Sequence, residues 1–131
     1  MPPQPWIHHI TLNVTDLKAS AEWYGRLLGL DVASERAGDG WRRLFFATDG
    51  FLLGLTQHDD TRSDDTFDVV RVGVDHIGVG CRNRKELEGW IEHLDAEGIA
   101  RSEVTEAASA HLVTCRDPDG IPIEFYWRVS Q

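Results

Sequence analysis

The sequence predicts an α+β fold made of two copies, in tandem, of one strand–helix–strand–strand–strand unit. Two short stretches rich in β-forming residues each open on a histidine, His9 in one and His76 in the other. An amphipathic helical pattern follows each stretch, and three further strand-like stretches separated by turn residues follow each helix. The two halves also match each other residue by residue, which indicates an internal repeat.

The repeat is visible as a constant step between equivalent residues. The same step relates three pairs, namely His9 and His76, Trp23 and Trp90, and Leu27 and Leu94. Later in each unit an Asp-Gly pair, 49–50 or 119–120, follows at a slightly longer step, as short loop insertions produce. We therefore expect a single domain with module 1 at about 6–57, an acidic linker at about 58–71 and module 2 at about 72–128.

The elements of module 1 follow from local patterns. Residues 7–14 alternate like a half-buried strand. Thr15 or Asp16 can cap the helix that follows, and its apolar face combines Leu17, Ala21, Tyr24 and Leu28 at helical spacing. Gly29 is placed to end that helix. Turn residues then separate three expected strands at 30–35, 41–47 and 51–56.

Module 2 repeats this order. Its first strand is expected at 74–81, and Asn83 with Glu86 forms a capping-box pattern. The helix buries a stripe that includes Trp90, and Gly98 stops it. Three strands are expected at 99–104, 111–115 and 121–127. Trp23 and Trp90, at matching helix positions, are interpreted as core anchors.

The composition and net charge of the chain exclude some classes of function. The chain has 131 residues, 41% hydrophobic and 27% charged, as in an ordinary globular domain. A net charge of −9 argues against nucleic acid and against an anionic membrane surface. The first residues have no signal-peptide pattern, and Cys81 and Cys115 are not spaced as a redox or zinc pair. We therefore expect a cytoplasmic protein with reduced cysteines.

A comparison of the side chains that share a strand face in the two modules indicates a candidate metal site. Side chains two apart on a strand share a face. Aligning the last strands of the modules at Asp-Gly places Glu124 opposite Gly54. If the modules pack as pseudo-equivalents, positions 9, 54, 76 and 124 approach one another. Two imidazoles and one carboxylate, from His9, His76 and Glu124, suit Fe(II), Mn(II), Zn(II), Ni(II) or Co(II).

Other residues are candidates for substrate contacts. Tyr126 follows Glu124 on the same strand face and can bind a substrate oxygen or take part in catalysis. Asn13 and Thr56 are candidates for orienting the substrate. His58 continues the face of Gly54 and Thr56 and is a candidate general base. For each of them, an ordinary structural role is the competing interpretation.

The motifs resemble the vicinal oxygen chelate superfamily of glyoxalases, bleomycin-resistance proteins and extradiol dioxygenases. The resemblance rests on the opening His-Ile-Thr-Leu-Asn-Val at 9–14, Leu-Leu-Gly-Leu at 27–30 and Arg-Asp-Pro-Asp-Gly-Ile-Pro-Ile-Glu-Phe at 116–125. It implies two βαβββ modules whose mixed, curved sheets form a metal-binding cup. It implies metal ligands at His9, His76 and Glu124, and a homodimer whose cup forms within one chain or from modules of two chains.

At several positions the sequence departs from the patterns of particular family members. Gly54 stands where metal-dependent glyoxalase I and methylmalonyl-coenzyme A epimerase use a side chain. Thr114 stands near the position of a tyrosine in extradiol dioxygenases, and residues 106–111 do not resemble the phosphonate-binding run of fosfomycin-modifying enzymes. Isomerase, lyase and ring-cleaving dioxygenase activity all remain open. The alternative is a non-catalytic protein that sequesters a small molecule, as bleomycin-binding members do without metal.

Overall fold

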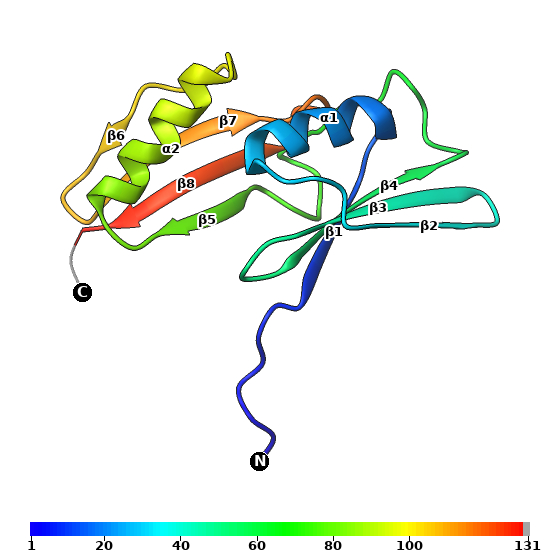
Figure 1. The fold of residues 1–131 in the computed structure, drawn as a ribbon, viewed down its shortest axis with the longest axis horizontal. Coiled ribbons are helices and arrows are strands. Elements are labelled where there is room, and N and C mark those ends of the chain that lie inside the picture. Colours follow the sequence, from blue (N-terminus) through cyan, green and yellow to red (C-terminus); the bar gives the residue numbers. More distant parts are fainter. Residues whose placement is uncertain (130–131) are drawn as a thin grey trace. The chain divides into compact units, whose positions relative to one another are not determined.

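A computed structural model describes residues 1–129 of the chain. By their internal contacts the residues divide into two compact units, Met1–Asp65 and Thr66–Gln131. Each unit has its own sheet and its own helix, so each is described by itself (Figure 1).

The first unit is a four-stranded mixed sheet with one helix. In chain order it contains β1 (His9–Asn13), α1 (Leu17–Leu28), β2 (Ser34–Gly38), β3 (Trp41–Ala47) and β4 (Leu52–His58). The strands lie in the order β1-β4-β3-β2. β1 runs parallel to β4, while β2, β3 and β4 form an antiparallel meander. The helix is the crossover connection that the parallel β1–β4 arrangement needs.

The second unit repeats this topology. It contains β5 (Ile77–Cys81), α2 (Arg84–Ala96), β6 (Thr105–Glu106), β7 (Ala110–Arg116) and β8 (Pro122–Arg128). Their order is β5-β8-β7-β6, and β5 is parallel to β8. The predicted βαβββ repeat in an α+β fold is therefore confirmed: two mixed four-stranded sheets, each with one helix.

The helices begin and end where their caps require. The Asp16 side chain accepts a hydrogen bond from the Ala19 amide at 3.1 Å and caps α1. In α2 the Asn83 side chain accepts from the Glu86 amide at 2.9 Å, and the Glu86 carboxylate reaches back to the Arg82 amide at 2.7 Å. Gly29 and Gly98 follow the helices with φ of 64° and 66°, values that glycine adopts without strain.

Two predicted strands are displaced for a physical reason. The strand expected at 30–35 begins only at Ser34, because the Leu30 amide still bonds the Gly25 carbonyl at the end of α1. The strand expected at 99–104 is found later and shorter, as β6, and residues 99–104 contribute one bridge at Arg101. Ile99 is buried there, and its amide bonds the carbonyl of Leu94, as in a hydrophobic helix stop.

Each sheet buries one face against its helix. In the first unit Leu12, Phe46 and Leu55 are almost fully buried. In the second, Phe125 has no exposed surface and stacks on Trp90 with ring centroids 4.3 Å apart. Trp90 and Trp23 are both half-buried: Trp90 packs on the core residue Phe125, and Trp23 meets the ring of the buried Tyr24 edge-on. The opposite face carries His9, Asn13 and Arg43 in the first sheet and Glu124 and Tyr126 in the second.

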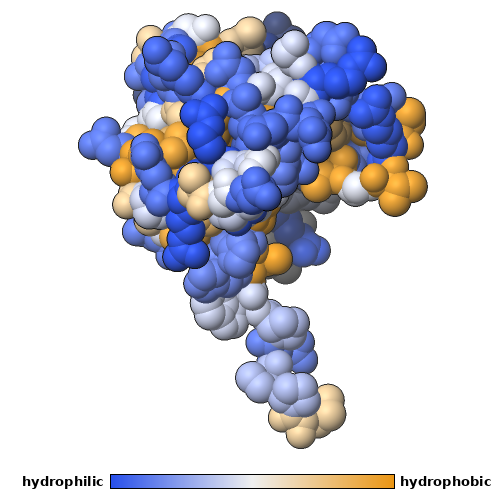
Figure 2. Space-filling view, turned by 90° about the vertical axis from the view of Figure 1, so that its right-hand side faces the viewer, coloured by the Kyte–Doolittle hydropathy of each residue, from blue (hydrophilic) through white to orange (hydrophobic). Residues whose placement is uncertain are grey.

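Figure 2 shows hydrophilic side chains over most of the face in view, with hydrophobic ones gathered in a few places. Among the described residues, no helix is long and apolar enough to cross a membrane.

The reactivity of the buried Cys115 thiol tests the packing of the core of the second unit. The residue is 2% exposed, and burial raises the pKa of its thiol to about 11. Because the thiolate is the reactive form, we expect the native protein to react with a thiol reagent at pH 8 at least tenfold more slowly than the unfolded chain. A Cys81→Ala variant isolates the signal of Cys115. Equal rates in native and unfolded protein would contradict the burial.

The same pKa shift gives a pH dependence of stability. The folded thiol keeps its proton to a higher pH than the unfolded one. Between the unfolded pKa, about 8.5, and the folded value of about 11, the unfolded state therefore holds fewer protons. The free energy of unfolding contributed by Cys115 is present below that window and is lost as the pH rises through it.

Candidate functional site

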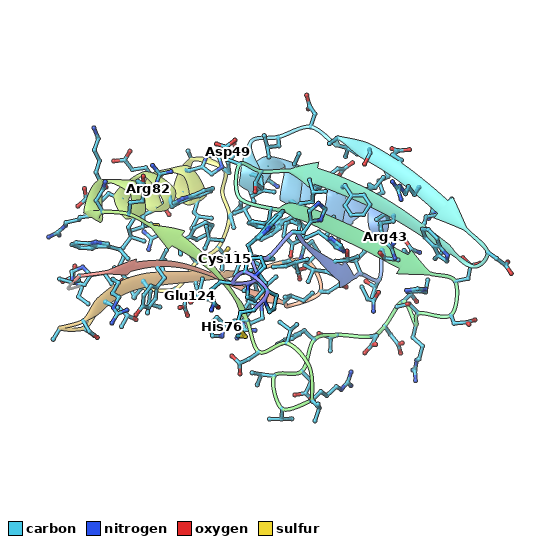
Figure 3. All side chains as sticks on the ribbon, turned by 90° about the horizontal axis from the view of Figure 1, so that it is seen from below. Arg43, Asp49, His76, Arg82, Cys115 and Glu124 are labelled. Carbon is cyan, nitrogen blue, oxygen red and sulfur yellow. The ribbon has the colours of Figure 1, made fainter. Side chains whose placement is uncertain are left out.

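Two of the three predicted metal ligands lie together in the second unit. His76 directly precedes β5, and Glu124 is the third residue of β8. Their side chains approach with His76 Nε2 4.0 Å from Glu124 Oε1 (Figure 3). One divalent ion with bonds of about 2.1 Å to nitrogen and oxygen can contact both atoms, because 4.0 Å is shorter than two such bonds.

Asp75 orients the His76 ring. An ionised carboxylate can only accept hydrogen bonds, so His76 Nδ1–H donates to Asp75 Oδ1 over 2.7 Å. This hydrogen bond raises the pKa of His76 above its usual 6.5, burial lowers it, and the nearby Glu124 carboxylate raises it. In the neutral ring, the lone pair is then on Nε2, the atom that faces Glu124. A carboxylate behind the imidazole is the usual support of a metal-binding histidine.

His9 has a comparable neighbour in the first unit. His9 Nδ1 lies 2.8 Å from His8 Nδ1, so one of the two rings donates to the other. His8 is the repeat equivalent of Asp75. Adjacent side chains of a regular strand point to opposite faces, but the rings of His8 and His9 meet. His8 precedes the first residue of β1, so the alternation of the strand does not govern it.

The strand register explains why one of the four repeat-related positions is glycine. Gly54 pairs with Thr11 on β1, and Glu124 pairs with Gly78 on β5, so the two positions occupy equivalent registers in their sheets. A Cβ on Gly54 would lie 2.7 Å from Thr11 Oγ1 and 2.9 Å from Phe45 Cε1. A Cβ on Gly78 would meet no atom within 4 Å. Space beside Glu124 is therefore open, whereas the space at Gly54 is filled by its neighbours.

The predicted substrate-binding residues of module 1 share one row across the sheet. Asn13 pairs with Thr56, and Thr56 pairs with Arg43. Thr56 is only 1% exposed, and its Oγ1 accepts a hydrogen bond of 2.7 Å from Arg43 Nε. Thr56 can therefore influence a bound substrate by positioning the side chain of Arg43. Sequence reasoning missed Arg43 and Asp75; the adjacency of Asp75 to His76 was an available signal, whereas finding Arg43 required the register between β3 and β4.

The remaining candidates lie on strand faces that the register defines. Tyr126 shares the face of Glu124 on β8 and is half-buried. His58 is exposed at the end of β4, opposite Trp41. His111 faces the helix side of its sheet, where its ring meets the ring of Trp127. Of these three, only Tyr126 belongs to the strand face that carries a pair of candidate ligands.

Within the described residues, no group of three or more His, Cys, Asp or Glu side chains is arranged to hold a metal ion. The pair in the second unit and His9 in the first are therefore described separately. Assembly of the three-residue site remains a prediction.

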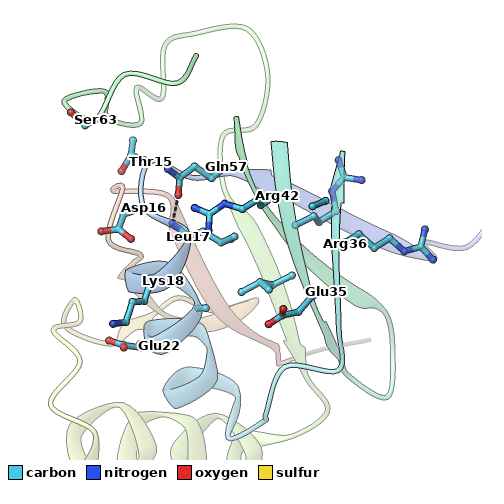
Figure 4. Close-up of a pocket in the computed structure, with 14 residues that line it drawn as sticks. Thr15, Asp16, Leu17, Lys18, Glu22, Glu35, Arg36, Arg42, Gln57 and Ser63 are labelled. Atoms are coloured by element: carbon cyan, nitrogen blue, oxygen red, sulfur yellow. Dashed lines mark hydrogen bonds between the residues drawn. The ribbon is translucent and has the colours of Figure 1, made fainter. Parts of the chain in front are cut away.

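The first unit also has an open cavity of about 930 Å³ between the start of α1 and the β2–β3 hairpin (Figure 4). Charged side chains of both signs line it, among them Lys18, Glu35 and Arg42. Gln57 closes one side, where its Oε1 accepts a hydrogen bond of 2.7 Å from the amide of Leu17. Besides the start of α1, its lining includes residues 35–37 of β2 and 42–44 of β3, Arg36 and Arg43 among them.

The tandem βαβββ topology, with a histidine at the opening of each module and a glutamate on the last strand, defines a two-module α+β protein of the glyoxalase type. The family model of the Glyoxalase/Bleomycin resistance protein/Dioxygenase superfamily matches residues 6–125. The chain belongs to this superfamily, and the resemblance inferred from its motifs is confirmed.

The chain is also similar over nearly its whole length to individual proteins and solved structures. The chain is 27% identical to the protein YqjT of Bacillus subtilis (strain 168), over 90% of this chain and 95% of that one. The crystal structure of a glyoxylase/bleomycin resistance protein/dioxygenase domain from Frankia sp. EAN1pec has a TM-score of 0.85 and 26% identity, covering 96% and 99% of the two chains. A lactoylglutathione lyase from Agrobacterium tumefaciens has a TM-score of 0.73 and 22% identity, covering 96% of each chain, and shares the fold.

Proposed function

We propose that the protein is a metal-dependent enzyme of the vicinal oxygen chelate type that acts on a small oxygen-bearing substrate. The observation that carries the proposal is the His76–Glu124 pair, backed by Asp75. His9, at the repeat-equivalent position, is the proposed third ligand. Two imidazoles and one carboxylate leave coordination positions for two substrate oxygens.

The chain's own residues have separable roles in this proposal. His9, His76 and Glu124 would hold a divalent ion, whose chemistry is to polarise a substrate carbonyl or stabilise developing negative charge on oxygen. Asp75 keeps the proton on Nδ1 of His76 and leaves Nε2 available. Tyr126, on the face of Glu124, can donate a hydrogen bond to a substrate oxygen, and Asn13 can orient the substrate. His58, exposed at a strand end, is the candidate proton carrier. The reaction is an isomerisation, a lyase reaction or a ring-cleaving dioxygenation.

The first test is elemental analysis of untagged protein reconstituted in turn with Fe(II), Mn(II), Co(II), Ni(II) and Zn(II). We expect about one ion per chain for at least one metal, and its identity narrows the reaction class. Failure to retain any of these ions would contradict the enzyme proposal. It would favour the alternative, a non-catalytic protein that sequesters a small molecule, which ligand screening by thermal shift can test.

We also propose a homodimer, which the family resemblance implies. Exposed apolar side chains at the start of the second unit support it, because Val70 is 84% and Val72 is 108% exposed. Light scattering after size exclusion should give about twice the 14.8 kDa chain mass. A monomeric mass at micromolar concentration would contradict the proposal.

The dimer also allows a test of whether the site forms within one chain or between two. Mixed dimers of His9→Ala and Glu124→Ala chains can hold metal only if the ligands come from different chains. Metal at one ion per mixed dimer would indicate sites shared between chains, and its absence would indicate sites within each chain.

A further inference from the structure

Two arginines face each other on the sheet face of the first unit that lies opposite α1. Arg36 on β2 pairs directly with Arg43 on β3, which continues the row of Asn13 and Thr56. Facing residues of an antiparallel pair have Cβ atoms about 5 Å apart, where like charges repel. Within residues 1–129 no acidic side chain pairs with either guanidinium, although the chain has 22 acidic and 13 basic residues.

Arg43 is held in place by its neighbours. Its Nε donates to the buried Thr56 hydroxyl over 2.7 Å, and its Cζ lies 4.6 Å from the centroid of the Trp41 ring. That ring packs onto the backbone of Gly38, where a Cβ would lie only 2.4 Å from it. The guanidinium is therefore fixed by a hydrogen bond and an aromatic face, and its terminal amino groups remain for another acceptor. An ordered arginine loses little entropy when it binds an anion.

We propose that Arg43, with Arg36 beside it, binds a carboxylate or phosphate group of a small-molecule ligand. The terminal amino groups of a guanidinium match two oxygens of either anion. The chain has a net negative charge, which repels anions from most of its surface. Two arginines side by side, with no acidic partner among the described residues, are therefore a local exception, at which an anion can bind.

This inference rests on the proposed function only in identifying the anionic ligand as the substrate of the enzyme. His9 shares the sheet face of Arg43 and lies four residues from Asn13 along β1, while β3 is two strands from β1. At about 3.3 Å per residue and about 4.8 Å per strand, the Cα atoms of His9 and Arg43 are roughly 16 Å apart. The anionic group would then belong to the end of the substrate remote from the metal.

The test is calorimetric titration of the full-length, metal-free protein with succinate and with inorganic phosphate at low salt. We expect saturable binding of at least one of the two anions, and the stronger of them identifies the anion class. Arg43→Gln should weaken that binding at least tenfold, and Arg36→Gln severalfold. Arg43→Lys should restore only part of the affinity, because an ammonium lacks the two-pronged geometry.

Arg42→Gln is the matched control. It removes the same charge from the neighbouring position of β3, but its side chain points to the other face of the sheet because side chains alternate along a strand. We expect less than a twofold change in affinity for this variant. Equal weakening by Arg42→Gln and Arg43→Gln would overturn the proposal, since net charge alone would then explain the binding. Absence of saturable binding to the wild-type protein would overturn it as well.

Two further measurements keep the outcomes separate. Circular dichroism and thermal unfolding check that Arg43→Gln is folded, and Arg36→Gln provides an independent variant whose side chain is exposed. Because the titration is done without metal, anion binding by a protein that retains no metal would leave this site standing and refute the proposed function. A protein that retains metal but binds neither anion would leave the proposed function standing and refute the anion site.

Discussion

His76→Ala and Glu124→Ala should each abolish stoichiometric metal binding, with affinity for the ion reduced more than 100-fold. Each substitution removes one donor from a set of three, and the two donor atoms lie 4.0 Å apart in the folded protein. His9→Ala should have the same effect if it is the third ligand. Calorimetric titration with the metal retained by the wild-type protein measures the loss directly.

Asp75→Asn should have a smaller effect on the same measurement, a 10- to 100-fold loss of affinity, because supporting residues typically contribute that much. The amide keeps the shape of the carboxylate but no longer carries the charge that holds the proton on Nδ1 of His76. A loss as large as that of His76→Ala would instead place Asp75 among the ligands.

Two control variants lie on α2. His93→Ala and Glu88→Ala remove one imidazole and one carboxylate from that helix, and both should leave metal affinity within twofold of wild type. If these controls lose as much metal as His76→Ala and Glu124→Ala do, binding is distributed over the surface. The three-ligand proposal would then be refuted.

Gly54→Ala should destabilise the protein by about 1–3 kcal/mol, the usual cost of forcing an extra atom into a packed site. The new Cβ would lie 2.7 Å from Thr11 Oγ1 and 2.9 Å from Phe45 Cε1. Threonine is branched at Cβ and has few rotamers to escape into. Urea unfolding followed by circular dichroism measures the difference, and an unchanged free energy of unfolding would contradict the close packing.

Gly78→Ala is the matched control, because Gly78 also lies within a strand and its added Cβ would meet nothing within 4 Å. We expect its free energy of unfolding to stay within about 0.5 kcal/mol of wild type. Combining Thr11→Ala with Gly54→Ala should recover part of the loss, as two changes at one contact are not additive. The result also bears on function, since a crowded Gly54 cannot be replaced by a fourth ligand without moving its neighbours.

Local patterns in the sequence were sufficient for the repeat, the helix caps and the fold class. Caps depend on residues within four positions of each other, as Asn83 and Glu86 show. The internal repeat also predicted that Gly54 and Glu124 are equivalent, and the structure places them at equivalent registers, opposite Thr11 and Gly78. The family followed from the same motifs, and the match over residues 6–125 confirms it.

Only the tertiary structure decided which side chains meet across strands. The contact of Arg43 with Thr56 depends on the pairing of β3 with β4, and a slip of one residue would have turned Arg43 to the helix side and brought Arg42 to this face. The contact between the His8 and His9 rings arises because β1 begins only at His9, beyond the reach of the alternation rule. Asp75 acquired its role through the rotamer that brings its carboxylate to His76 Nδ1. Sequence periodicity assigns a side chain to a face, whereas register and rotamers determine its partner.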